Sequence, residues 1–367
     1  MSLIIAEIGT AHGGDLKKAY QLIDAAVQSG ADVIKFQWVY ADEILHPNTG
    51  FVELPGGKIR LYDRFKQLEC PPDFYKKVND YVHKSGCKFC CSPFGLKSLD
   101  QLIELKPDYV KVASPELNHF PMLKRLAQHR ERLGAQKLPV ILSSGVSKME
   151  DIEKAIEIVG KENVSLLHCI TSYPAPESQY NLKVITTLKE KLGIECGVSD
   201  HSLDPILVPC LSIACGGSLI EKHICLSKKD PGLDDPVALE PEAFALMVHV
   251  VHQTEASYRH YGPQVAFDRL VDQLSEQFTK EKVLAVLGNG IKKLAPAEEA
   301  NYGRTNRSLH FMTDTKAGQI IKEEDIGVLR TEKVLLPGLP PDYLDKVIGA
   351  KLLRDVESGQ GVQKEDF

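Results

Sequence analysis

Two lysines stand where short apolar runs meet polar residues. Lys35 lies in VIKFQ, and Lys111 lies in YVKVASPE shortly before Ser114. Because side chains alternate along a strand, Lys35 and Gln37 share one face of the first run. A lysine that points into a protein is costly to bury unless it meets an anion. Together with the serine hydroxyl, the two lysines predict a cradle for a carboxylate or phosphate; a solvated lysine beyond a strand end is the simpler alternative for each.

Two histidines occur in the same way in later apolar runs. His201 lies in GVSDHS and His223 in EKHICL, where they share a face with Ser199 and Glu221, respectively. Asp200 points the opposite way, so these residues cannot form a Ser-His-Asp triad. On adjacent strands, the two imidazoles could bind one divalent ion and leave open positions, as a catalytic metal needs. The alternative is that one of them is a hydrogen-bonded core histidine.

Further polar residues close other runs. Glu7, in AEIG, could activate water, hold a water on a metal, or form a structural ion pair with one of the lysines. HCITSYPAP places Thr171 and Tyr173 on one face of a strand, with His168 pointing away from Thr171. GLDDP brings Asp234 onto a loop, where carboxylates are commonly solvated or form turns.

These residues need a scaffold that gathers strand ends, and the sequence contains one. Apolar runs alternate with amphipathic helical stretches, which indicates βαβ units, and eight in series predict an α/β fold with a closed (β/α)₈ TIM barrel. In that architecture, reactive groups collect at the carboxyl ends of the strands. The eight runs are LIIAEIG, ADVIKFQ, CKFCCSPF, DYVKVASPE, LPVILSSG, VSLLHCITSYP, ECGVSDHS and LIEKHICL.

The chain also divides into parts. We predict a barrel domain at 1–287, a linker at 288–302, where Gly and Pro break the helical pattern, and a small domain at 303–367. The segment from Trp38 to Pro71 is long for a loop, and we expect it to lie over the barrel mouth as a lid or binding loop. The small domain contains an internal echo, AGQIIKEEDI and SGQGVQKEDF, which predicts a pseudo-symmetric module of short strands.

Composition limits the class of protein. The 367 residues carry a net charge of −6, which argues against nucleic acid as the main partner. The nine cysteines lie mostly in apolar runs, as buried thiols do in a reducing compartment. No basic-then-apolar leader opens the chain, and no apolar run approaches membrane-spanning length. We therefore expect a cytoplasmic protein without a membrane partner.

The chain resembles the sialic acid synthase family, which includes N-acetylneuraminate, legionaminate and pseudaminate synthases and a spore coat polysaccharide branch. The resemblance covers nearly the whole chain, including a C-terminal antifreeze-like (SAF, β-clip) domain. Six motifs occur in the family's order, namely AEIGTAHGG, VIKFQ, YVKVASPE, LLHCITSYPAP, GVSDHS and EKHICL.

The resemblance implies a condensation of phosphoenolpyruvate with an N-acyl hexosamine-type sugar aldehyde, giving a nine-carbon 2-keto-3-deoxy sugar acid and phosphate. It also implies a Mn²⁺ or Mg²⁺ cofactor and a domain-swapped homodimer in which Arg330 enters the partner subunit's site. By position, the implied roles are catalysis by Glu7; phosphoenolpyruvate binding by Lys35, Lys111, Ser114, Thr171, Ser199 and Arg307; sugar binding by Gln37, Ser92, Glu116, Tyr173, Asp234 and Arg330; and metal binding by His201 and His223.

Two other functions are compatible with the sequence. A pyruvate-releasing aldolase would need a Schiff-base lysine in a desolvated pocket. A non-catalytic sugar-binding homologue would bind the sugar without releasing phosphate. Trapping by borohydride, without sensitivity to a chelator, would indicate the aldolase. Sugar binding without phosphate release in the presence of Mn²⁺ would indicate the non-catalytic homologue.

Overall fold

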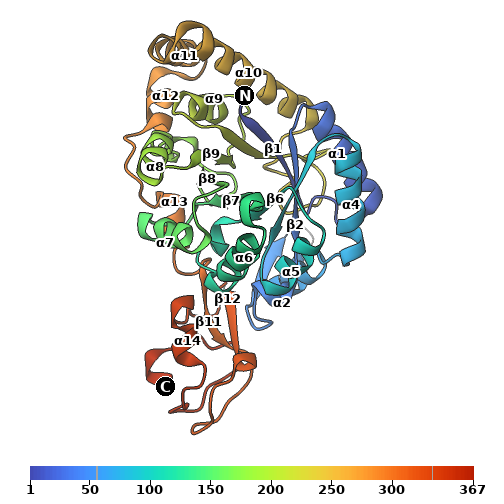
Figure 1. Ribbon diagram of the computed structural model, residues 1–367, viewed down its shortest axis with the longest axis vertical. Helices are drawn as coiled ribbons and strands as arrows, with labels where there is room; N and C mark the ends of the chain where they lie inside the picture. Colours follow the sequence, from blue (N-terminus) through green and yellow to red (C-terminus); the bar gives the residue numbers. More distant parts are fainter. Residues whose placement is uncertain (55–56, 333) are drawn as a thin grey trace.

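The chain folds into a closed parallel barrel with a small module at its C-terminus (Figure 1). The computed structural model describes residues 1–54, 57–332 and 334–367. Each of the eight apolar runs contains one barrel strand, in the order β1-β10-β9-β8-β7-β6-β5-β2 with β2 returning to β1, so the predicted (β/α)₈ fold is confirmed. Thr171 and Tyr173, expected on a strand face, lie in the loop after the strand that ends at Cys169. Their bounds are β1 Leu3–Gly9, β2 Val33–Trp38, β5 Lys88–Pro93, β6 Tyr109–Val112, β7 Val140–Ser143, β8 Val164–Cys169, β9 Glu195–Asp200 and β10 Leu219–His223.

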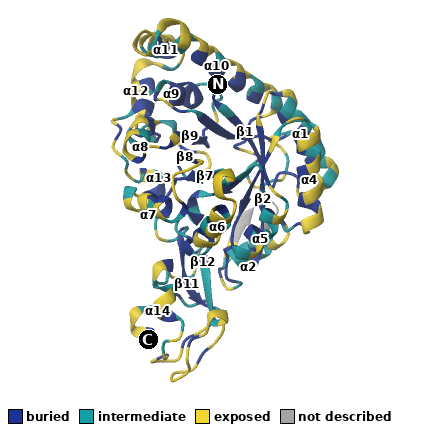
Figure 2. Ribbon diagram, viewed as in Figure 1, coloured by how far each residue is buried: buried dark blue, intermediate teal, exposed yellow. Residues whose placement is uncertain are grey.

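Amphipathic helices cover the barrel, their buried faces toward the strands (Figure 2). Helix α1 begins after Asp15, whose carboxylate accepts hydrogen bonds from the backbone N–H groups of Lys17 and Lys18, as expected of an N-cap. The helices between the barrel strands are α1 Leu16–Gln28, α4 Pro72–Lys84, α5 Leu96–Glu104, α6 Phe120–Arg132, α7 Met149–Val159, α8 Val184–Leu192 and α9 Leu207–Ala214. None of the helices within the described ranges is long and apolar enough to span a bilayer.

Three more helices explain why α9 is apolar on nearly every side. Helices α10 Pro241–Tyr261, α11 Pro263–Phe278 and α12 Lys280–Leu287 all contact α9, so it is enclosed between the barrel and this outer layer. A helix without a solvent face has no need of polar residues. Helices α11 and α12 meet at Thr279, which has a positive φ of 74°.

The barrel interior has an apolar floor. Ile5, Val33, Leu167 and Leu219 are buried there, with Cys90 and Ile141 in the same cluster. Because strand side chains alternate, the next inward residues two positions on are Glu7, Lys35, Cys169 and Glu221. The strand pattern thus places a layer of polar groups directly above the floor, at the carboxyl ends of the strands.

The long segment after β2 forms its own small elements. These are α2 Ala41–Ile44, strands β3 Phe51–Leu54 and β4 Gly57–Arg60, which pair as a hairpin, and α3 Leu61–Lys66. Phe65 and Leu68 line the cavity at the barrel mouth. The expectation that this segment covers the mouth is confirmed for these residues; part of the segment lies outside the described residues.

The C-terminal module projects beyond one side of the barrel (Figure 1). It contains α13 Pro296–Glu299 at its approach, the antiparallel pair β11 Arg307–Phe311 and β12 Ile326–Arg330, and α14 Leu344–Val347. The internal echo is structural, because Asp325 and Asp366 each accept a hydrogen bond from the backbone N–H three residues earlier, in matching 3₁₀ turns. Its core is small and consists of Leu309, Phe311, Ile321, Val347, Leu352, Val356 and Val362.

Candidate active site

Two buried lysines and two buried glutamates form an ionic cluster above the barrel floor. Lys35 pairs with Glu7 and lies 3.5 Å from Glu221 Oε1, measured from its Nζ. Lys111 Nζ lies 3.2 Å from the same Glu221 oxygen, which also accepts a hydrogen bond of 3.0 Å from Ser199 Oγ. The four charged side chains are each at most 4% exposed. The predicted inward lysines are confirmed, and Glu7 forms the ion pair that was its alternative role.

The electrostatics of this cluster follow from its burial. Burial raises the pKa of Glu221, but the Lys111 and Lys35 ammonium groups outweigh it and lower the pKa to about 2. Burial lowers the pKa of Lys35, an effect that Glu221 opposes and Lys111 reinforces. Two lysines and two carboxylates sum to zero charge, so an anion that enters must compete with a carboxylate for a lysine.

The two histidines lie on neighbouring strand ends, with ring centroids 5.5 Å apart. His201 Nδ1 lies 3.0 Å from the Ile170 carbonyl, so in a neutral ring the proton sits on Nδ1. Its Nε2 lone pair then faces the Tyr173 hydroxyl, 3.2 Å away. Burial lowers the pKa of His223 well below its ordinary value, and His201 and Lys35 lower it further, so this ring is neutral. The two imidazoles belong to neighbouring strand ends and line one cavity, an arrangement that suits a divalent cation.

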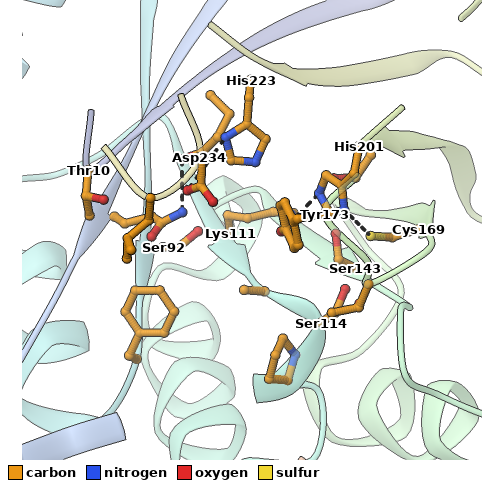
Figure 3. Close-up of a pocket in the computed structure, with 18 of the residues that line it drawn as sticks. Thr10, Ser92, Lys111, Ser114, Ser143, Cys169, Tyr173, His201, His223 and Asp234 are labelled. Carbon is orange, nitrogen blue, oxygen red and sulfur yellow. Dashed lines mark hydrogen bonds and ion pairs between the residues drawn. The ribbon is translucent and has the colours of Figure 1, made fainter. Parts of the chain in front are cut away.

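Neighbouring groups complete this side of the cavity. Figure 3 shows His223 beside Asp234 and, across the cavity, His201 beside Cys169 and Tyr173. His223 Nδ1 and Asp234 Oδ2 are 3.9 Å apart, and the Tyr173 ring stacks on His201 at 4.2 Å. Burial lowers the pKa of His201, but Cys169 and the Ile170 carbonyl raise it above its ordinary value. Within the described residues, no group of three or more His, Cys, Asp or Glu side chains is arranged to hold a metal, so a bound ion would need oxygen ligands from substrate or water.

Two residues predicted to point away from the site do so. Asp200 Oδ2 lies 2.6 Å from Lys222 Nζ, and its Oδ1 accepts a hydrogen bond from Tyr180. His168 Nε2 lies 2.6 Å from the Tyr180 carbonyl. The absence of a Ser-His-Asp triad is therefore confirmed by geometry.

Hydroxyl groups line the cavity next to the lysines. Ser114 Oγ accepts a hydrogen bond of 3.0 Å from the backbone N–H of Gly145. The hydroxyls of Thr171 and Ser143 are buried without a partner. A side chain at Gly145 would place its Cβ 2.0 Å from Thr171 Oγ1, so glycine is required at this position for the hydroxyl to be accommodated. Buried hydroxyls without partners are uncommon and are suited to receive a polar ligand.

Glu298, which the sequence analysis did not single out, holds the loops that contain Val146 and Thr171. Glu298, on α13, is fully buried. Its Oε1 accepts hydrogen bonds of 2.8 Å from the backbone N–H groups of Val146 and Thr171, and its Oε2 accepts one of 3.1 Å from Ala295. The predicted linker thus contributes a carboxylate that fixes two loops of the barrel mouth. The sequence around Glu298 has one signal, a proline followed by two glutamates. This pattern predicts the start of a helix but does not indicate that the helix contacts the barrel.

The C-terminal module reaches the site through two arginines. Glu116 Oε1 accepts from Arg307 Nη2 at 2.9 Å and from Arg330 Nη2 at 2.7 Å. Arg307 also donates to the carbonyls of Glu43 and Phe94, is 1% exposed and does not line the cavity. The guanidinium of Arg307 joins the module to the barrel, and the expected contact of Arg307 with phosphoenolpyruvate stays a prediction. Glu116 does not line the cavity either and is the shared partner of the two arginines, so its expected contact with the sugar stays a prediction.

Arg330 lies in the cavity of its own chain. The resemblance placed this arginine in a partner subunit's site, but the antiparallel pair β11–β12 brings it beside Glu116 of the same chain. One chain therefore contains an arginine at the site without a second subunit. The domain-swapped homodimer stays a prediction.

The cavity has a volume of about 270 Å³. Gln37 donates a hydrogen bond of 3.3 Å to Glu7, and Ser92 Oγ lies 3.4 Å from Lys35 Nζ, so both belong to the rim of the ionic cluster. Thirteen of the predicted site residues line this cavity, namely Glu7, Lys35, Gln37, Ser92, Lys111, Ser114, Thr171, Tyr173, Ser199, His201, His223, Asp234 and Arg330.

Known proteins share this sequence and fold. Family models described as "NeuB family" and "SAF domain" match residues 22–261 and 306–367. The chain is 30% identical over 370 residues to the spore coat polysaccharide biosynthesis protein SpsE of Bacillus subtilis, covering 99% of this chain and 93% of the relative. It is 30% identical over 371 residues to pseudaminic acid synthase of Campylobacter jejuni, covering 99% and 96%. Human N-acetylneuraminate-9-phosphate synthase is 29% identical over 373 residues, covering 99% and 91%. The crystal structure of Bacillus subtilis SpsE superposes with a TM-score of 0.81 at 29% identity, covering 100% of this chain and 94% of that one.

Proposed function

The chain belongs to the NeuB family, and from this premise we propose that it condenses phosphoenolpyruvate with an N-acyl hexosamine-type sugar aldehyde. The chain is a sialic acid-type synthase. The products would be a nine-carbon 2-keto-3-deoxy sugar acid and phosphate. The observation that carries the proposal is one cavity in which two buried lysines and several hydroxyl groups face two neighbouring imidazoles.

We place phosphoenolpyruvate on the lysine side of the cavity. Its carboxylate and phosphate would take hydrogen bonds from Lys35, Lys111 and Ser199, and the unpartnered Thr171 hydroxyl would donate to the phosphate. Charge-assisted hydrogen bonds of this kind are strong in a dry site. Because the cluster is neutral as it stands, the bound anion would draw Lys35 away from Glu7. Glu7 would then be free to hold a water molecule.

We place the sugar aldehyde between the two histidines, Asp234 and Tyr173. His201 and His223 would hold a Mn²⁺ or Mg²⁺ ion through ring nitrogens, and the 5.5 Å between their ring centroids fits a shared ion. A divalent ion bound there would act as a Lewis acid on the aldehyde oxygen. Arg330 and Gln37 lie at the rim, where sugar hydroxyl and acyl groups would be exposed to them.

The reaction follows from this arrangement. The methylene carbon of phosphoenolpyruvate forms a bond to the aldehyde carbon with the electrons of the enol double bond, which leaves an alkoxide on the former aldehyde oxygen and an electron-deficient C2. The water held by Glu7 adds to C2 and gives one proton to the carboxylate, from which it passes to the alkoxide. The C2–O bond to phosphate then breaks, phosphate leaves with the bonding electron pair and takes the remaining hydroxyl proton, and C2 becomes a ketone. Throughout the reaction, the two lysines would stabilise the negative charge of the carboxylate and phosphate groups on their side of the cavity.

The aldolase alternative is less well supported. A Schiff-base lysine must be a neutral amine with free access to a carbonyl carbon. Burial lowers the pKa of Lys35, which would favour that role, but both lysines are held by carboxylates within 3.5 Å. The position of the hydroxyl groups beside them favours anion binding.

The test is phosphate release from phosphoenolpyruvate in the presence of Mn²⁺ with a panel of N-acyl hexosamines. Release that depends on a sugar, and that EDTA abolishes, supports the proposal. Sugar binding without release supports a non-catalytic homologue. Inactivation by borohydride in the presence of pyruvate, with no effect of EDTA, supports the aldolase.

A further inference from the structure

The loop after β7, residues 144–147, contains a strained residue. Val146 has a φ of 42°, in the left-handed region, and its side chain is fully buried. A β-branched residue is rarely found there, because its Cβ then lies too close to the following carbonyl oxygen. Such a residue persists only where its surroundings hold it in place. We call this segment the β7 loop; it follows directly on Ser143, which lines the candidate active site.

Three side chains from one distant segment hold the β7 loop. They belong to residues 292–306, which lead from the barrel to β11. Glu298 Oε1 accepts a hydrogen bond of 2.8 Å from the Val146 N–H, and Asn306 Nδ2 donates one of 3.0 Å to the Val146 carbonyl. Lys292 Nζ donates one of 3.0 Å to the carbonyl of Ser144. Both peptide groups that flank the Val146 Cα are therefore fixed, and a rotation toward negative φ would break these contacts.

The β7 loop contacts the groups that we assign to the phosphate of phosphoenolpyruvate. The Gly145 N–H donates to Ser114 Oγ at 3.0 Å, which leaves the hydroxyl hydrogen of Ser114 for another acceptor. Glu298 Oε1 also accepts from the Thr171 N–H at 2.8 Å, so it fixes a residue whose hydroxyl is buried without a partner. A Cβ on Gly145 would lie 2.0 Å from Thr171 Oγ1 and 2.9 Å from Ser114 Oγ. Because the packing is this close, a shift of the loop would move both hydroxyl groups.

We propose that Lys292, Glu298 and Asn306 are positioning residues for phosphoenolpyruvate, since they impose the β7 loop conformation that aligns Ser114 and Thr171 with its phosphate. This inference rests on the proposed function and gives the segment before the C-terminal module a part in it. Hydrogen bonds from this segment offset the backbone strain at position 146. The phosphate site is therefore complete only while residues 292–306 are docked on the barrel.

Glycine at position 146 separates this role from a general effect on stability. Glycine adopts positive φ without steric strain, so with Val146→Gly the β7 loop can take the same conformation without help from the distant segment. Loss of the Asn306 side chain should then matter much less. A residue that only stabilised the fold would give the same change in phosphoenolpyruvate affinity whichever residue stands at position 146.

The test measures the Kd of phosphoenolpyruvate by titration calorimetry, together with KM for both substrates. We expect Asn306→Ala and Lys292→Met each to raise Kd and KM for phosphoenolpyruvate by about tenfold, as the loss of a hydrogen bond to a buried carbonyl implies, and KM for the sugar by less than about twofold. Combined with Val146→Gly, Asn306→Ala should raise Kd by less than about threefold relative to Val146→Gly alone. The exposed neighbour Lys293→Met is the matched control for Lys292→Met and should behave as the wild type.

Unchanged affinity for phosphoenolpyruvate in both single variants overturns the inference and leaves the proposed function intact, as does an equal loss with and without Val146→Gly. If Asn306→Ala does not fold, as judged by thermal unfolding, Lys292→Met and its control decide the matter. A wild type that binds phosphoenolpyruvate but releases no phosphate with any sugar refutes the proposed function, and the calorimetric comparison still tests the positioning role. A wild type that does not bind phosphoenolpyruvate refutes both.

Discussion

Replacement of Glu298 tests whether the approach to the C-terminal module organises the barrel mouth. The carboxylate is fully buried and accepts three backbone hydrogen bonds, two of them from Val146 and Thr171, at 2.8 Å each, and one from Ala295. Glu298→Ala leaves three buried N–H groups without partners. Each such donor costs about 1–3 kcal/mol. Allowing for relaxation, we expect the free energy of unfolding to fall by about 3–5 kcal/mol, a large share of a typical total of about 5–15 kcal/mol.

A graded series makes the reasoning specific. In Glu298→Gln the amide oxygen can still accept from Val146 and Thr171, while the amide NH₂ faces the Ala295 N–H, so about 1–3 kcal/mol should be lost. The neighbouring Glu299 is exposed, and Glu299→Ala should change the free energy of unfolding by less than about 0.5 kcal/mol. Denaturant unfolding measures all three values.

Activity gives a second readout of the same variants. Because Val146 and Thr171 belong to loops beside the lysines, Glu298→Gln should raise KM for phosphoenolpyruvate more than KM for the sugar. The reasoning is refuted if Glu298→Ala unfolds at the same denaturant concentration as Glu299→Ala. It is also refuted if Glu298→Gln is as unstable as Glu298→Ala, since the charge and not the three hydrogen bonds would then be decisive.

Three further predictions follow from other parts of the site. Thr171→Val removes a buried hydroxyl that has no partner, so stability should be unchanged or higher while KM for phosphoenolpyruvate rises by about tenfold; a fall in stability, measured by thermal unfolding, would contradict this. His201→Gln and His223→Gln should each weaken Mn²⁺ binding, followed by electron paramagnetic resonance, by about tenfold or more, and the exposed His249→Gln should not. Burial and the nearby Lys18 lower the pKa of His12 from 6.5 to about 4. Between pH 6.5 and about 4, His12 is therefore protonated in the unfolded chain and neutral in the folded chain. Stability present above pH 6.5 should therefore decline by about 3 kcal/mol as the pH falls to about 4, and His12→Asn should decline less over that range in denaturant titrations; an identical decline would assign the loss to other groups.

The residues of the ionic cluster could be predicted because they depend on local periodicity. Alternation along a strand decides that Lys35 faces inward two positions after Val33, and that Asp200 faces outward beside Ser199. Barrel closure then brings the strand ends together whatever the loops do. For the same reason, the apolar runs sufficed to predict the number and order of the strands.

Contacts between distant segments were decided only by the tertiary structure. Glu298 meets Thr171 across 127 residues, and Arg330 meets Glu116 across 214, and neither pair leaves a pattern in its own stretch of sequence. Arg307 has the same residue type as a phosphate ligand, but burial against Glu116 and two carbonyls gives it a structural role. Periodicity determines which way a side chain points, whereas its partner depends on how the chain closes on itself.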